Sequence, residues 1–142
     1  MKYITTLIIA FTFFSTLNLG AQTEKELITK TLMDYIEGTA NGEPERLKNA
    51  FHKDLNLYHV TNDSIVVWSG QKYISNVKLG EKSNRIGKII SIDYKNNAAS
   101  AKIEVDMPDK KRVYTDYLLL LKTGGNWQII HKSFTYVKYP GN

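Results

Sequence analysis

Residues 112–136 read RVYTDYLLLLKTGGNWQIIHKSFTY, and this stretch decides the fold. Two runs rich in β-branched and aromatic residues flank Gly124 and Gly125, and glycine adopts the positive φ angles of a tight turn without steric cost. The stretch therefore predicts a β-hairpin. Residues 118–121 are four consecutive leucines, which place apolar side chains on both faces of the first strand. We expect both faces to be covered, at the centre of a sheet or by a partner.

The composition predicts one globular domain. A chain of 142 residues, 42% hydrophobic and 23% charged, is long enough for one core and short for two. The net charge of +5 is spread along the chain, and the one basic cluster, Lys110-Lys111-Arg112, falls at an expected turn. We interpret that cluster as a solvated turn and expect no nucleic-acid partner.

The first 21 residues differ in composition from the rest. Lys2 precedes an apolar stretch over residues 4–19, and Gly20-Ala21 offers small residues for cleavage. This pattern predicts a signal peptide removed after Ala21; an uncleaved membrane anchor is the alternative. The chain has no cysteine, which excludes a lipoprotein anchor, disulfides and thiolate metal sites. We expect a secreted or periplasmic bacterial protein, without membrane attachment after cleavage.

The remaining chain predicts helices first and long strands later. A capping box at Thr23 and Glu26 opens a first helix, and Pro44 opens a second that closes near His52. The alternation that follows predicts a hairpin from Asp54. We expect a domain over residues 22–138, a tail over residues 139–142, and these further elements: a hairpin over 54–68, a short helix over 71–79, and strands over 85–93 and 98–107.

This order is typical of an α+β fold, with helices gathered on one face of a curved sheet. Several motifs of the chain carry a family resemblance: Tyr35-Ile36-Glu37-Gly38, Asn41-Gly42, Leu47, Ala50-Phe51-His52, Thr115-Asp116-Tyr117-Leu118, Leu120-Leu121-Lys122, Trp127, Ile129, Lys132 and Phe134. Together they resemble the nuclear transport factor 2-like superfamily, whose SnoaL-like and ketosteroid isomerase-like members form cones, and more narrowly its secreted "putative lumazine-binding" group. The resemblance implies a cone-like, curved mixed sheet with N-terminal helices on its concave face, and a homodimer through the open sheet face.

Asp116 is the strongest catalytic candidate. It lies within the most apolar strand, between Tyr114 and Leu118 on one face. A buried carboxylate is either hydrogen-bonded for structural reasons or functional, as a general base with a pKa raised by desolvation. Both interpretations stay open at this point.

The chain has three histidines: His52, His59 and His131. His52 at the end of a helix is expected to cap the free carbonyls. His59 and His131 lie in predicted strands, where a shared face would place them together in a pocket, and His131 is the second catalytic candidate. No closely spaced ligand pair such as HxH or HxxxH occurs, so we expect no metal site and no cofactor.

Polar-tipped residues within apolar elements predict a pocket under the helices, and their rings favour a small aromatic ligand. Core or interface packing is the alternative for each. The resemblance further implies that Tyr35 takes the tyrosine role of ketosteroid isomerase-like members. Their paired acids are not matched, because Glu104 and Asp106 fall on a polar strand face. The predicted ligand-binding residues are Tyr35, Tyr58, Trp68, Asp116 and His131.

Two functions follow as hypotheses. The first is a small-ligand-binding protein without catalytic activity. The second is a small-molecule isomerase, dehydratase or cyclase that uses Asp116 or a strand histidine as general base. Fold alone does not choose between them, because the superfamily includes both enzymes and binding proteins.

Overall fold

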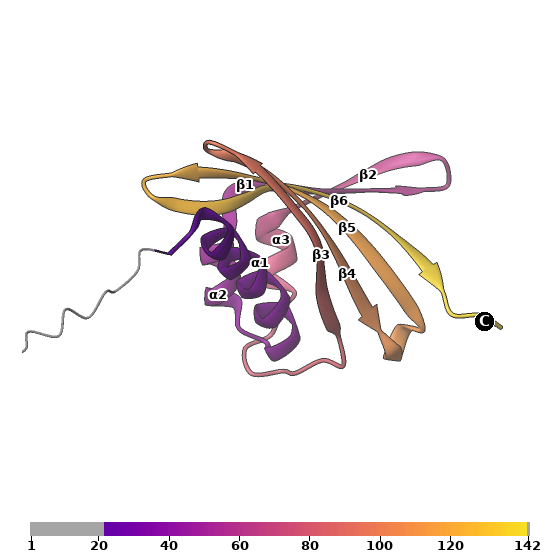
Figure 1. Ribbon diagram of the computed structural model, residues 1–142. Helices are drawn as coiled ribbons and strands as arrows, with labels where there is room; N and C mark the ends of the chain where they lie inside the picture. Colours follow the sequence, from indigo (N-terminus) through magenta and orange to yellow (C-terminus); the bar gives the residue numbers. More distant parts are fainter. Residues whose placement is uncertain (1–21, 142) are drawn as a thin grey trace, which may run out of the picture.

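Figure 1 shows a strongly curved sheet with helices on its concave side, in a computed structural model that describes residues 22–141. This is the α+β cone predicted from the sequence, and the fold class is confirmed. The predicted signal peptide, residues 1–21, lies outside the described residues. Within residues 22–141, no helix is both long and apolar enough to cross a membrane.

The sheet has six strands in the order β2-β1-β6-β5-β4-β3. It is mixed, because β1 pairs with β6 in parallel while every other neighbouring pair is antiparallel. The predicted hairpin supplies β5 and β6, the two central strands, and its turn contains Gly124 at φ 56° and Gly125 at φ 84°. The strands are β1 (Phe51–Thr61), β2 (Ser64–Ser69), β3 (Ile86–Lys95), β4 (Ala98–Met107), β5 (Arg112–Thr123) and β6 (Asn126–Lys138).

Three α-helices close the concave face: α1 (Glu24–Asn41), α2 (Pro44–Ala50) and α3 (Gly70–Ser75). Helix α1 begins with the predicted capping box, in which the Glu26 backbone donates to the Thr23 hydroxyl and the Thr23 backbone donates to Glu26. Its apolar face, including Ile28, Leu32 and Tyr35, is fully buried against the sheet. Burial of this face fixes the direction in which α1 presents Tyr35.

The leucine run alternates across the sheet. Leu118 and Leu120 are buried in the core, whereas Leu119 and Leu121 are 49% and 43% exposed. A single chain therefore covers one face of β5, and cover for the other face stays a prediction.

Two predicted boundaries are wrong. Helix α2 ends at Ala50 because Phe51 adopts extended geometry (φ −102°, ψ 134°) and pairs with Ile129 at the start of β1. His52 consequently lies in β1 and does not cap α2. Helix α3 ends at Ser75, short of the predicted residue 79. A short 3₁₀ helix, η1 (Pro108–Lys110), joins β4 to β5.

Candidate functional site

Three buried polar side chains meet on the concave face: Tyr35, Asp116 and Lys132. The Tyr35 hydroxyl donates to Asp116 Oδ2 at 2.7 Å, and Lys132 Nζ donates to the same oxygen at 2.8 Å. Lys132 Nζ also lies 2.5 Å from the Tyr35 hydroxyl oxygen. The three residues are 0%, 1% and 5% exposed. Such a pair of opposite charges survives burial because it is paired and further hydrogen-bonded.

Strand register brings the two charged residues together. Asp116 of β5 pairs with Phe134 of β6, and Leu118 pairs with Lys132. Asp116 and Lys132 are therefore diagonal neighbours on the same face of the antiparallel pair, within reach of a long side chain. Tyr35 approaches them from α1, which lies over this face of the sheet.

Arg85, just before β3, adds a second cation to this cluster. Its guanidinium donates to the Tyr73 hydroxyl at 3.4 Å and to the Tyr35 hydroxyl at 3.5 Å. The close approach of α1 to β3 at Gly87 allows this, because a Cβ on Gly87 would lie 2.5 Å from a methyl carbon of Ile36. The glycine lets α1 lie close to the start of β3, so that Arg85 and Tyr35 make contact.

Beside the cluster lies a cavity of about 130 Å³. Its walls are largely apolar and aromatic, with a few convergent polar groups, as in small-molecule sites generally. Tyr35 supports the cluster from outside the cavity lining. The lining residues are Leu57, Trp68, Tyr73, Arg85, Val105, Met107, Lys110, Tyr114, Asp116, Lys132 and Phe134.

One oxygen of Asp116, a residue that lines this cavity, has no protein partner. Asp116 Oδ2 receives two donors, but the buried Oδ1 atom accepts no hydrogen bond from any described residue. A buried acceptor without a partner carries the full cost of its desolvation. Asp116 Oδ1 is therefore the group best placed to accept a hydrogen bond from a bound molecule.

The electrostatic field of the cluster acts differently on its two tyrosines. Burial, reinforced by the negative charge of Asp116, raises the pKa of Tyr35 well above its ordinary value. Burial also disfavours the phenolate of Tyr73, yet the positive charges of Arg85 and Lys132 outweigh it and lower the pKa of Tyr73. The field around Tyr73 thus favours a negatively charged oxygen.

The structure brings together three of the five predicted pocket residues. Tyr35, Trp68 and Asp116 lie on the concave face, but Tyr58 and His131 stack on each other at 4.8 Å on the opposite face. Their expected convergence with Asp116 is not found, because His131 pairs with the outward-facing Leu119. The ligand-binding role of all five residues stays a prediction.

His59 and His131 do not share a face, so that expectation is wrong. His59 stacks on Phe134 at 4.8 Å and meets Trp68 edge-on at 5.1 Å, on the concave side. Its buried Nδ1 atom has no partner among the described residues. No cluster of His, Asp and Glu able to hold a metal ion occurs within residues 22–141.

Sequence reasoning missed Lys132, Arg85 and Tyr73 as site residues. Lys132 carried a signal, because it is a lysine within an apolar strand, between Ile129 and Phe134. Arg85 carried none, since it is only the first residue of the strand predicted over residues 85–93. Tyr73 lies within the short helix predicted over residues 71–79, where no pattern marked it as a site residue.

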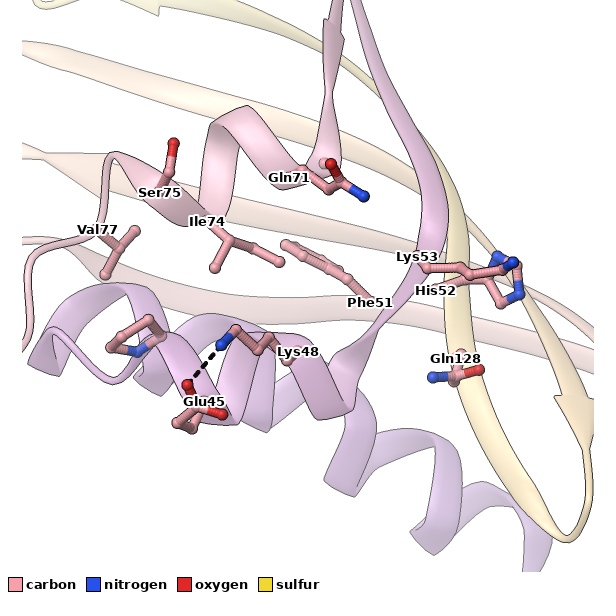
Figure 2. A pocket seen from close by; sticks show the side chains of 12 residues that line it. Glu45, Lys48, Phe51, His52, Lys53, Gln71, Ile74, Ser75, Val77 and Gln128 are labelled. Atoms are coloured by element: carbon pink, nitrogen blue, oxygen red, sulfur yellow. Dashed lines mark hydrogen bonds and ion pairs between the residues drawn. The ribbon is translucent and has the colours of Figure 1, made fainter.

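A larger hollow of about 840 Å³ lies elsewhere, on the surface between α2, α3 and the start of β1. Figure 2 shows the side chains of Phe51 and Ile74 pointing toward each other among the residues that line it, with the Lys48–Glu45 ion pair (2.6 Å) at one side. That ion pair is exposed, and none of the charged side chains lining the groove is buried. We take the smaller cavity as the candidate site because it gathers buried charges and an unpartnered acceptor.

Known proteins of similar sequence and structure agree with this architecture. Nuclear transport factor 2-like proteins of unknown function from Shewanella baltica OS155 and Methylobacillus flagellatus KT are 26% and 25% identical to this chain, with TM-scores of 0.68 and 0.69. The matches cover 80% of this chain and 94% and 91% of theirs. A protein named aldolase FrzH, from Cladobotryum sp, is 27% identical over 112 residues, which are 78% of this chain and 90% of that protein.

The model of one protein family matches residues 23–135, nearly all of the described chain. The family is described as "Putative lumazine-binding". The match confirms the resemblance drawn from the sequence, at the level of both superfamily and family. The chain belongs to this family, described as "Putative lumazine-binding", within the nuclear transport factor 2-like superfamily.

Proposed function

We propose that this protein binds a small planar ligand in the concave cavity. The observation that carries the proposal is Asp116, which is 1% exposed and has one oxygen held by Tyr35 and Lys132 while the other has no partner. This arrangement holds an unpartnered hydrogen-bond acceptor in place on a residue that lines the cavity. The ring of Phe134 and the indole of Trp68 supply flat walls beside it.

The family name supports the same class of ligand. Lumazine is a flat heterocycle with N–H donors and carbonyl acceptors along one edge. Asp116 Oδ1 complements a ligand donor, and the guanidinium of Arg85 complements a ligand acceptor. The proposal is binding without turnover, because Asp116 Oδ2 is committed to two donors that hold the carboxylate in place.

Proton transfer in the same cavity is the second candidate function. Asp116, Arg85 and Tyr73 all line the cavity, so a carboxylate base and donors to a developing oxyanion lie along one space. An isomerase, dehydratase or cyclase would use this arrangement. The relative that is named as an aldolase supports this second candidate function.

Native mass spectrometry of protein purified from its own host tests the proposal first, since an enclosed ligand survives mild purification. Calorimetric titration with lumazine then compares wild type with Asp116→Asn. We expect Asp116→Asn to weaken binding about 10-fold or more, the loss of a hydrogen bond to a charged group.

His131→Gln is the matched control, because His131 lies on the opposite face of the sheet. We expect it to leave the affinity unchanged. If His131→Gln weakened binding as much as Asp116→Asn, the site would lie on the outer face. Unchanged affinity with lost turnover in Asp116→Asn would favour the catalytic candidate.

We also propose export and pairing of two copies. The composition of residues 1–21 supports secretion or a periplasmic location. Tyr117, Leu119 and Leu121 support a homodimer, since they lie 52%, 49% and 43% exposed along the outer face of a central strand. Apolar side chains gathered on one face are typical of interaction surfaces.

A further inference from the structure

The cavity holds more positive than negative charge. Lys132 and Asp116 form an ion pair at 2.8 Å and balance each other. Arg85 lines the same cavity, and no carboxylate within residues 22–141 forms an ion pair with it. Lys110 contributes a further cation to the wall. The described part of the chain thus leaves the cavity with an uncompensated cation.

Arg85 has hydrogen-bonding capacity to spare. A guanidinium carries five N–H donors in a rigid fork. Two of the contacts of Arg85, to Tyr73 and Tyr35, lie at 3.4 and 3.5 Å, near the outer limit for a hydrogen bond. Both acceptors are phenol oxygens. A carboxylate would satisfy this fork better than either, because carboxylate and guanidinium geometries match.

The lowered pKa of Tyr73 points the same way. The charges of Arg85 and Lys132 favour the phenolate there even though burial opposes it. The same positive charges also favour an anionic oxygen on a ligand beside Arg85 in the adjoining cavity.

Cavity size limits the ligand. A cavity of roughly 150 Å³ is known to hold benzene, and the cavity here is about 130 Å³. The volume is thus close to that of one six-membered ring, and because the cavity is partly open, ring substituents can extend toward its mouth. The second ring of a bicyclic ligand such as lumazine would lie largely outside it.

We propose that the ligand is a single-ring aromatic carboxylate with an O–H or N–H donor, its carboxylate bound by Arg85 and its donor accepted by Asp116 Oδ1. This inference rests on the proposed function and names the ligand class for the same site. Arg85 then selects charge, Asp116 selects the donor, and Trp68 and Phe134 hold the ring. The ion pair of Lys132 and Asp116, which has no net charge, holds the carboxylate and its acceptor Oδ1 in place.

Three kinds of probe separate these contributions by calorimetric titration at neutral pH. The 3- and 4-hydroxybenzoates carry charge and donor, benzoate carries charge alone, and the matching hydroxybenzamides carry no charge. For the better hydroxybenzoate isomer, we expect wild type to bind about 10- to 100-fold tighter than its amide, as for hydrogen bonds to charged groups. We expect benzoate to bind more weakly than the hydroxybenzoate.

Two variants assign the preferences to residues. Arg85→Met is expected to remove the preference for acid over amide, and Asp116→Asn the preference for hydroxybenzoate over benzoate. Arg85→Lys should keep part of the charge preference because the cation remains. Lys88→Met is the matched control, since Lys88 is an exposed cation on β3, and it should change neither preference.

The comparison in wild type needs no variant to fold, so the proposal stands or falls on it. If the amide binds as tightly as the acid, the charge inference is overturned while ligand binding in the cavity survives. If no single-ring probe binds but lumazine does, the size inference is overturned and the proposed function is again intact. If neither class binds and natively purified protein is empty, both proposals fail.

Discussion

The two faces of the central β5–β6 hairpin differ in chemistry, although successive residues of the same two strands alternate between them. The concave face carries Asp116, Leu118 and Lys132, all buried under α1. The outer face carries Tyr117, Leu119 and the Tyr58–His131 stack, open in the single chain. Charged side chains are buried where each lies beside a side chain of opposite charge, as Lys132 and Asp116 do. Apolar side chains stay exposed on the face that no helix covers.

The largest expected effect comes from breaking the buried pair. Lys132→Met leaves Asp116 as an uncompensated charge at 1% exposure, and we expect about 3–5 kcal/mol of destabilisation. Urea denaturation monitored by circular dichroism measures it. Lys138→Met, an exposed lysine on the same strand, is the control and should stay within about 0.5 kcal/mol.

The double variant Lys132→Met with Asp116→Leu removes both charges. We expect it to recover much of the lost stability, because an apolar pair of similar volume often replaces a buried ion pair without loss. A double variant no more stable than Lys132→Met alone would show that packing, rather than the stranded charge, caused the effect.

The next effect separates the faces directly. Leu118→Ala opens a cavity in the core and is expected to cost about 2–5 kcal/mol. Leu119→Ala, one residue along and half exposed, should cost less than about 1 kcal/mol in dilute solution. The same denaturation measurement compares them. Equal losses would mean that the outer face is packed as tightly as the core.

Features of the fold that depend on neighbouring residues could be predicted from the sequence. The apolar run over residues 118–121 and the Gly124-Gly125 turn are such local features, so they predicted the central hairpin and the burial of Asp116 within its first strand. The face of His131 did not, because β6 has an irregular register between Leu119 and Leu120 of its partner. A slip of one residue moves a strand's side chains to the other face.

Arg85 shows a second kind of limit. Its role arises where α1 crosses β3 at Gly87, a contact between segments about 50 residues apart in the chain. No local pattern encodes such an encounter. Lys132 was missed for a different reason, despite its apolar neighbours in the sequence. Lysine is almost never fully buried unless it is paired, so an exposed position was the default expectation.

A smaller effect tests the outer face as an interface. Leu119→Lys introduces a charge among apolar side chains there, and we expect it to shift a dimer toward monomer in light scattering at tens of micromolar. Burial of one such side chain contributes about 1–2 kcal/mol. Val137→Lys, also an exposed apolar residue of the hairpin but near its end, serves as the comparison. A wild-type monomer at these concentrations would contradict the dimer.

The smallest effect reads the charge of the concave face through Tyr73. Its folded pKa is lowered from the ordinary value of 10.0, so the unfolded chain binds more protons between the two values and stability rises with pH in that window. The contribution is present above pH 10 and is lost as pH falls through the folded pKa. Tyr35 acts oppositely: its pKa is raised, so its contribution is present below pH 10 and is lost above it.

We expect one of the nine tyrosines to develop phenolate absorbance ahead of the others in a near-ultraviolet titration. Tyr73→Phe should remove that early transition, whereas Tyr117→Phe on the outer face should leave it. An early transition that persists in Tyr73→Phe would place the positive field somewhere other than the cavity.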